Sequence, residues 1–216
     1  MSARAERDDA MTSVDELLDH PDVAQLRGAL AKRPGVRIEA EDALVRLAAI
    51  ALVLRPGTTG APELLMIKRA EAERDPWSGH VACPGGRMEP GDRDLEQTAI
   101  RETWEETGVD LARDGRVLGT LDDISPRTPV LPPIIVRPFV AVVKPEVEIV
   151  QSSEVAEAFW VPLLALRERA SWGTGLVTVR GHGEREVNVF RHGDYTVWGL
   201  TERVLRQFLE YLDSRW

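Results

Sequence analysis

The sequence is poor in cysteine, in aromatic side chains and in basic charge. Among its 216 residues only Cys83 carries a thiol, which excludes an intrachain disulfide and is typical of a reducing compartment. The formal net charge is −9, whereas a nucleic-acid-binding face is normally basic. No apolar run approaches the roughly 18 residues that a membrane span needs, and the N-terminus lacks an apolar signal core. We therefore expect a cytoplasmic protein with neither a nucleic-acid nor a membrane partner.

Hydrophobic residues make up 43% of the chain, which is enough for one good core. Apolar periodicity, turn residues and capping signals predict a mixture of strands and helices. We expect strands over 43–56, 63–69, 80–83, 115–124, 134–143 and 158–161, helices over 95–107, 163–169 and 200–212, and a hairpin formed by 176–180 and 187–191. Residues 14–33 predict one kinked helix or two short ones, interrupted at Pro21. The pattern favours one α/β domain over 37–216, preceded by an N-terminal helical extension over 1–36.

The predicted helix over 95–107 carries an unfavourable group of acids. Glu102, Glu105 and Glu106 lie three and four residues apart, and like charges at these spacings weaken a helix. They also lie towards the C-terminal end, where the helix dipole disfavours negative charge. A solvated acidic face is the ordinary explanation of such a cluster, but no lysine is present over 87–107 to balance it. The imbalance favours a divalent cation such as Mg²⁺, which binds carboxylates together with water and substrate phosphate.

The segment from Gly86 to Val109 resembles the Nudix box. The matching residues are Gly86, Arg101, Glu102, Glu105, Glu106, Gly108 and Val109. The RExxEExG half of the box matches in full, although Thr103 replaces the usual apolar residue. In the first half Asp92 replaces the usual glutamate, and one extra residue separates it from Arg101. The resemblance implies an α/β/α sandwich around a mixed β-sheet, and hydrolysis of a nucleoside diphosphate linked to another moiety.

The resemblance also implies roles for individual residues. Glu102, Glu105 and Glu106 would bind Mg²⁺ or Mn²⁺, with the carbonyl oxygen of Gly86 as a further ligand. Arg101 would pair with carboxylates and hold them in place.

The general base varies within the family, so three candidates stay open. Glu105 lies within the box itself. Glu154 and Glu157 qualify only by their position outside the box.

The wider sequence resembles the coenzyme A pyrophosphatase branch of this superfamily. The likeness covers about residues 45–210 and rests on the stretches LLMIKRA, SGHVACPGG, IIVRPFVAV and DYTVWGLTERVL, although Cys83 replaces the usual phenylalanine. It implies coenzyme A as substrate, with 3′,5′-ADP and 4′-phosphopantetheine as products. We select five candidate substrate-binding residues for phosphate contact or base stacking: Arg69, Arg74, Trp77, Arg127 and Arg137.

Other readings stay open at this point. The same chemistry could act on ADP-ribose, NADH or another nucleotide, with a different substrate pocket. A non-catalytic Nudix module that binds a nucleotide and regulates a partner is an alternative of another class. Residues 14–33 could cover the site or join a homodimer interface, and the sequence does not decide between them.

Overall fold

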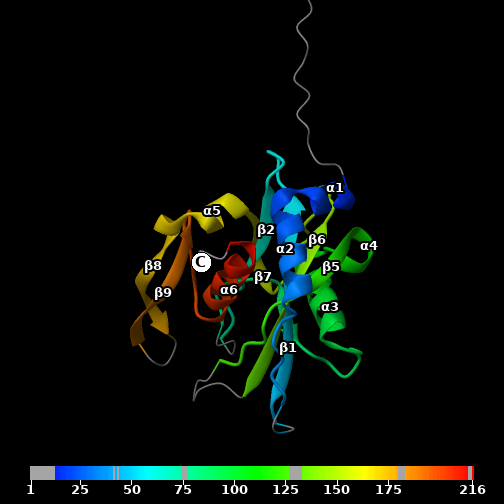
Figure 1. The fold of residues 1–216 in the computed structure, drawn as a ribbon. Coiled ribbons are helices and arrows are strands. Elements are labelled where there is room, and N and C mark those ends of the chain that lie inside the picture. Colours follow the sequence, from blue (N-terminus) through cyan, green and yellow to red (C-terminus); the bar gives the residue numbers. More distant parts are fainter. Residues whose placement is uncertain are drawn as a thin grey trace, which may run out of the picture.

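The computed structural model describes residues 13–40, 42, 44–73, 77–126, 133–179, 183–213 and 216. Two β-sheets and the helices packed on them make up the fold (Figure 1). The strands are β1 (Arg46–Pro56), β2 (Pro62–Arg69), β3 (Val81–Ala82), β4 (Gly85–Arg87), β5 (Gly115–Thr120), β6 (Ile134–Val143), β7 (Val155–Pro162), β8 (Trp172–Val179), β9 (Gly183–His192) and β10 (Tyr195–Trp198). The helices are α1 (Val14–Asp19), α2 (Pro21–Lys32), α3 (Leu95–Thr107), α4 (Leu111–Asp114), α5 (Leu163–Arg167), η1 (Arg169–Ser171) and α6 (Leu200–Leu212).

The larger sheet is mixed, as the sequence predicts. Its main order is β3-β2-β1-β6-β5, with β4 paired to β1 and β7 paired to β2. The central pair, β1 and β6, is parallel, and the other pairs are antiparallel. Strand β3 pairs with β2, and strand β4 pairs with β1. The chain therefore passes from the edge of β2 to β1 between β3 and β4, shortly before it enters α3.

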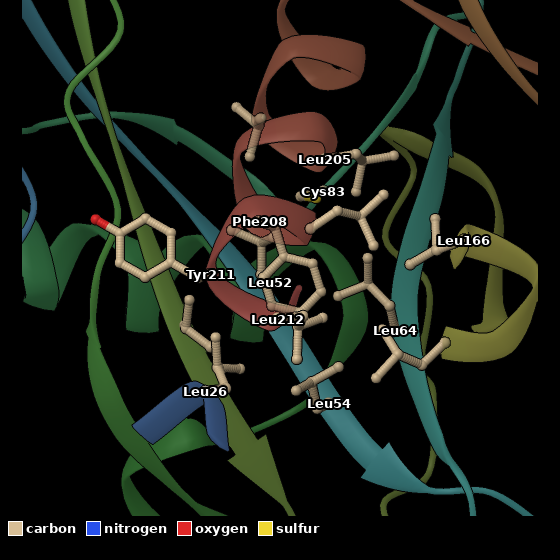
Figure 2. Packing of buried hydrophobic residues seen from close by; sticks show 14 of the residues in the cluster. Leu26, Leu52, Leu54, Leu64, Cys83, Leu166, Leu205, Phe208, Tyr211 and Leu212 are labelled. Carbon is tan, nitrogen blue, oxygen red and sulfur yellow. The ribbon is translucent and has the colours of Figure 1, made fainter. Parts of the chain in front are cut away.

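Helices cover both faces of this sheet, which explains why β1 is almost continuously apolar. Leu52 and Leu54 belong to the hydrophobic cluster formed with α1, α2 and α6. Ala51 and Val53, which alternate with them, belong to the cluster on the side of α3 and α4. Figure 2 shows Leu52 and Leu54 on the side of the sheet that carries Phe208 and Leu212 of α6. The α/β/α layering predicted from the Nudix resemblance is therefore confirmed.

The N-terminal segment forms two short helices. His20 follows α1 as its C-cap, and its ring nitrogen caps α2 by accepting from the amide of Asp22, while Pro21 occupies the first turn. Leu17 and Leu26 are fully buried in the cluster that includes α6 and the sheet. These helices therefore share a core with the rest of the chain, and the domain boundary at residue 37 stays a prediction.

The smaller sheet consists of β8, β9 and β10 in antiparallel order. The sequence predicts only a hairpin here, with shorter strands than the structure has, and it gives no strand at 195–198. Figure 1 shows α6 between this sheet and the larger one, and α6 contacts both β9 and β10. Among the described residues, no helix is long and apolar enough to cross a membrane.

Candidate active site

Helix α3 and the loop before it position the acidic residues. The Asp94 side chain caps the helix by accepting from the amide of Gln97 at 2.8 Å. The helix ends at Gly108, whose φ of 72° lies in the left-handed region that glycine adopts readily. Strand β4 brings Gly85 and Gly86 against this helix. These two glycines therefore lie beside the acids.

Glu106 is the most deeply buried acid of the box, with 3% of its surface exposed. The amide of Gly85 donates to its Oε2 at 2.8 Å, and Nη1 of Arg69 lies 3.3 Å from its Oε1. Burial raises the pKa of Glu106 to about 7, although the Gly85 hydrogen bond and the charge of Arg69 act in the opposite direction. The site thus holds a carboxylate whose negative charge is only partly compensated.

The Glu102 carboxylate lies against Gly86 of β4. A Cβ atom added to Gly86 would lie 2.3 Å from Oε1 of Glu102, so only glycine leaves room for this carboxylate. Burial raises the pKa of Glu102, opposed by the neighbouring Arg101, and the charge of Glu154 raises it further. Glu102 and Glu106 also repel each other. A cation placed between them would relieve this repulsion.

Arg101 connects the acids to the loop, as the resemblance implies. Its Nε and Nη2 donate to both carboxylate oxygens of Asp92, at 3.0 and 2.9 Å. Its Nη1 donates to Glu102 at 3.0 Å and to Glu105 at 2.9 Å, and its Nη2 also donates to the carbonyl oxygen of Arg87. The guanidinium therefore fixes helix α3 to the preceding loop at several points.

Asp92, which stands where the sequence pattern has a glutamate, forms an ion pair with Arg101. Its side chain is 3% exposed, and it also accepts from the hydroxyl of Thr98 and the amide of Glu89. The hydrogen bonds from Arg101 hold the pKa of Asp92 well below its usual range. The shorter acid and the extra residue after it are thus accommodated in the loop, with the two-bond ion pair to Arg101 intact. The sequence shows that an aspartate replaces the glutamate, but it does not show that this aspartate pairs with Arg101.

Glu105, Glu154 and Glu157 differ in their partners and in their positions relative to the site. Glu105 is 47% exposed at its side chain and turns to Arg101, away from the buried Glu106. Glu154 is exposed, but its charge acts on both Glu102 and Glu106, which places it beside the site. Glu157 instead forms a hydrogen bond with the hydroxyl of Tyr195. Of the two acids outside the box, the structure therefore brings only Glu154 to the others.

The candidate substrate-binding residues are dispersed. Arg69 lies in the site through its contact with Glu106. Trp77 is half-buried in a turn, and its carbonyl oxygen accepts a hydrogen bond from the amide of His80 at 3.0 Å. Arg137 forms a two-bond ion pair with Asp123, whose side chain is fully buried, so its guanidinium already has a structural partner. Arg74 and Arg127 lie outside the described residues.

The acids that the structure describes do not by themselves form a closed cation site. Among the residues that the structure describes, no three His, Cys, Asp or Glu side chains converge closely enough to enclose an ion. Arginines account for part of this separation, because Arg101 lies between Glu102 and Glu105 and Arg69 contacts Glu106. The donor chemistry nevertheless fits, since oxygen ligands with pKa values raised by burial and mutual repulsion are those a hard cation would stabilise.

Comparison with known proteins decides the family. The NUDIX domain family model matches residues 44–178. This chain belongs to the Nudix family. The matched span includes the box and all strands of the larger sheet, and it begins after α1 and α2.

Curated Nudix relatives extend the match beyond the box. A mitochondrial coenzyme A diphosphatase of Homo sapiens is 33% identical over 167 residues, which cover 76% of this chain and 70% of that protein. A peroxisomal coenzyme A diphosphatase of Caenorhabditis elegans is 34% identical over 64% of this chain and 56% of its own length. A MutT/nudix family protein from Enterococcus faecalis aligns in structure with a TM-score of 0.54 at 17% identity, over 92% of this chain and 73% of that one. The structural likeness supports the fold alone.

Proposed function

We propose that this Nudix pyrophosphohydrolase cleaves the diphosphate of coenzyme A or a coenzyme A derivative, giving 3′,5′-ADP and 4′-phosphopantetheine. The observation that carries the substrate is the similarity to two coenzyme A diphosphatases, the human one over 76% of this chain. The human relative is also covered over 70% of its own length, so the likeness extends well past the catalytic box.

The chemistry assigns Glu102, Glu105 and Glu106 as ligands of Mg²⁺ or Mn²⁺, with the carbonyl oxygen of Gly86 as a further ligand. Nudix hydrolases generally use divalent cations, and such a cation would neutralise the diphosphate and lower the pKa of an attacking water. Glu105 forms an ion pair with Arg101 at 2.9 Å, and this pair must open before Glu105 can bind the cation. The raised pKa values of Glu102 and Glu106 support their assignment because they mark negative charge that lacks compensation.

Glu154 is the best placed general base. It is exposed to solvent, it lies within electrostatic range of Glu102 and Glu106, and it belongs to neither the helix nor the arginine network that holds the box. A base must reach a water molecule near the cleaved bond, and an exposed carboxylate beside the ligand set meets that requirement. Arg69, which contacts Glu106, would also contact the substrate phosphates. A cytoplasmic location and a homodimer stay predictions.

A substrate panel tests the proposal. The purified chain is incubated with coenzyme A, acetyl-coenzyme A, ADP-ribose and NADH, with Mg²⁺, with Mn²⁺ or with a chelator, and the products are identified by mass spectrometry. We expect 3′,5′-ADP from coenzyme A in a metal-dependent reaction, with the highest kcat/KM of the panel. The Glu106→Gln variant is the control for contaminating hydrolases.

Two other outcomes would contradict the proposal in different ways. A higher kcat/KM for ADP-ribose or NADH would keep the chemistry and reject coenzyme A as the substrate. No metal-dependent hydrolysis of any nucleotide would favour a binding module over an enzyme.

A further inference from the structure

His80 lies next to the arginine that contacts the catalytic acids. Strands β2 and β3 pair with Lys68 opposite Val81, and one residue beyond this pair the Arg69 amide donates to the His80 carbonyl at 2.9 Å. The backbone of His80 is therefore held to the residue whose side chain reaches Glu106.

The smaller sheet contributes a second ring at this position. The indole of Trp198 lies against the His80 ring, with 4.4 Å between ring centroids and an interplanar angle of 52°. Its position is fixed by pairing with the fully buried Val189 and by the buried Val197 before it. Gly199 follows with a φ of 69°, so the chain turns there into α6. Trp198 thus has a defined position at the end of β10.

Core packing does not account for this ring pair. Trp172 and Phe190 of the smaller sheet also form a ring pair, and both belong to or pack against the main hydrophobic cluster. Among the described residues, Trp198 belongs to none of the three clusters and to none of the hydrophobic side chains packed against them. Both His80 and Trp198 are half-buried. A partly exposed indole can form a stacking surface for a nucleobase. This one lies against the histidine whose backbone is bonded to Arg69, the arginine that contacts Glu106.

We propose that Trp198, supported by His80, stacks on the base of the nucleoside diphosphate substrate and so determines substrate affinity. This inference rests on the proposed function only in requiring a nucleoside diphosphate substrate. It gives the smaller sheet a role in recognition, since β10 carries the ring to the site from outside the larger sheet. The described residues show no hydrogen bond or ring contact between Trp198 and the acids of the box, so we expect Trp198 to act on binding and not on the chemical step.

Steady-state kinetics of three variants test the proposal. Trp198→Leu keeps an apolar side chain and removes the ring face, Trp198→Phe keeps a ring, and His80→Ala removes the support. Each is measured with coenzyme A, or with whichever panel nucleotide the wild-type chain hydrolyses best, and its melting temperature is recorded. We expect Trp198→Leu to raise KM by about 5- to 100-fold with kcat nearly unchanged, because base stacking on an aromatic residue contributes an affinity of that size. Trp198→Phe should restore most of the affinity.

The outcomes separate this inference from the proposed function. A wild-type chain that ignores coenzyme A but hydrolyses another nucleotide refutes the substrate assignment, and the Trp198 kinetics are then measured on that nucleotide. An unchanged KM in Trp198→Leu would refute the stacking role. A fall in kcat at constant KM, or an equal loss in the Leu and Phe variants, would show a structural role instead. If Trp198→Leu does not fold, His80→Ala and Trp198→Phe decide, since His80→Ala must raise KM by several-fold for the proposal to stand.

Discussion

Gly86 offers the sharpest test of the site, because its missing side chain leaves the space that Glu102 occupies. A Cβ atom at this position would lie 2.3 Å from Oε1 and 2.4 Å from Cδ of Glu102, whereas ordinary van der Waals contact begins at 3.4 Å. In a Gly86→Ala variant the carboxylate must therefore retreat by about 1 Å, since close-packed atoms do not interpenetrate. The Gly86 carbonyl oxygen, a proposed ligand, is retained in alanine.

The expected loss is in activity and not in stability. A displacement of about 1 Å at a catalytic group costs on the order of 10²-fold in rate, so kcat/KM should fall by about that factor, and the Mg²⁺ concentration needed for half-maximal rate should rise. Gly86 has no positive φ, and the clash meets the flexible end of a side chain. Alanine should therefore fold as well as glycine, or slightly better through a smaller unfolded-state entropy.

Two neighbouring glycines provide matched controls for this experiment. Nothing lies within 4 Å of a Cβ added at Gly91, so Gly91→Ala should leave both kcat/KM and the melting temperature unchanged. Gly85 has a φ of 153°, and a Cβ there would lie 2.3 Å from the carbonyl oxygen of Ala49, so Gly85→Ala should lower the melting temperature. Near-normal kcat/KM in Gly86→Ala would refute the placement of Glu102, and a lowered melting temperature in that variant would show that the backbone moves instead.

Two further predictions use the pKa values. Glu106→Gln should lower kcat by more than the roughly 10- to 100-fold that removal of a ligand-orienting group costs. Its free energy of unfolding in urea at pH 8 should be no lower than that of the wild type, since burial already raises the pKa of Glu106 to about 7 and disfavours its charge; a large destabilisation would contradict this. Asp114 has a pKa lowered to about 2 by hydrogen bonds from Arg113 and Lys144. A lowered folded-state pKa stabilises the native state above the ordinary value near 4, and this contribution is lost as pH falls toward 2. Urea unfolding between pH 5 and 3 should thus show a smaller loss of stability for Asp114→Asn than for the wild type, and equal losses would refute the assignment.

Local signals sufficed for the helix that carries the acids. The sequence predicts 95–107, and α3 has these bounds, because the cap at Asp94 and the left-handed turn at Gly108 are set by neighbouring residues. Strands β4 and β10 were missed for the opposite reason. Gly85–Arg87 becomes a strand only through pairing with β1, and Tyr195–Trp198 only through pairing with β9. Short segments of this kind have little intrinsic preference of their own.

The candidate site divides in the same way. The sequence places Thr98, Glu102, Glu105 and Glu106 along one side of the helix. The structure buries Glu106 and leaves Glu105 half-exposed, because these two side chains differ by about 100° around the helix axis and only one of them turns toward β4. Spacing along a helix gives the relative directions of the side chains, but the element packed against the helix decides which direction is buried.

The sequence by itself determined the acidic helix, because its caps and its acids lie close together in the chain, and the resemblance of this segment to the Nudix box implied the family and with it the fold. Tertiary structure decided what surrounds the acids. Arg69 approaches α3 from a strand, Asp92 from a loop and Glu154 from the turn before β7. Trp198 lies against His80 from a second sheet. These groups are brought together by strand pairing and by burial in a shared core, which are contacts between distant parts of the chain that no local spacing encodes.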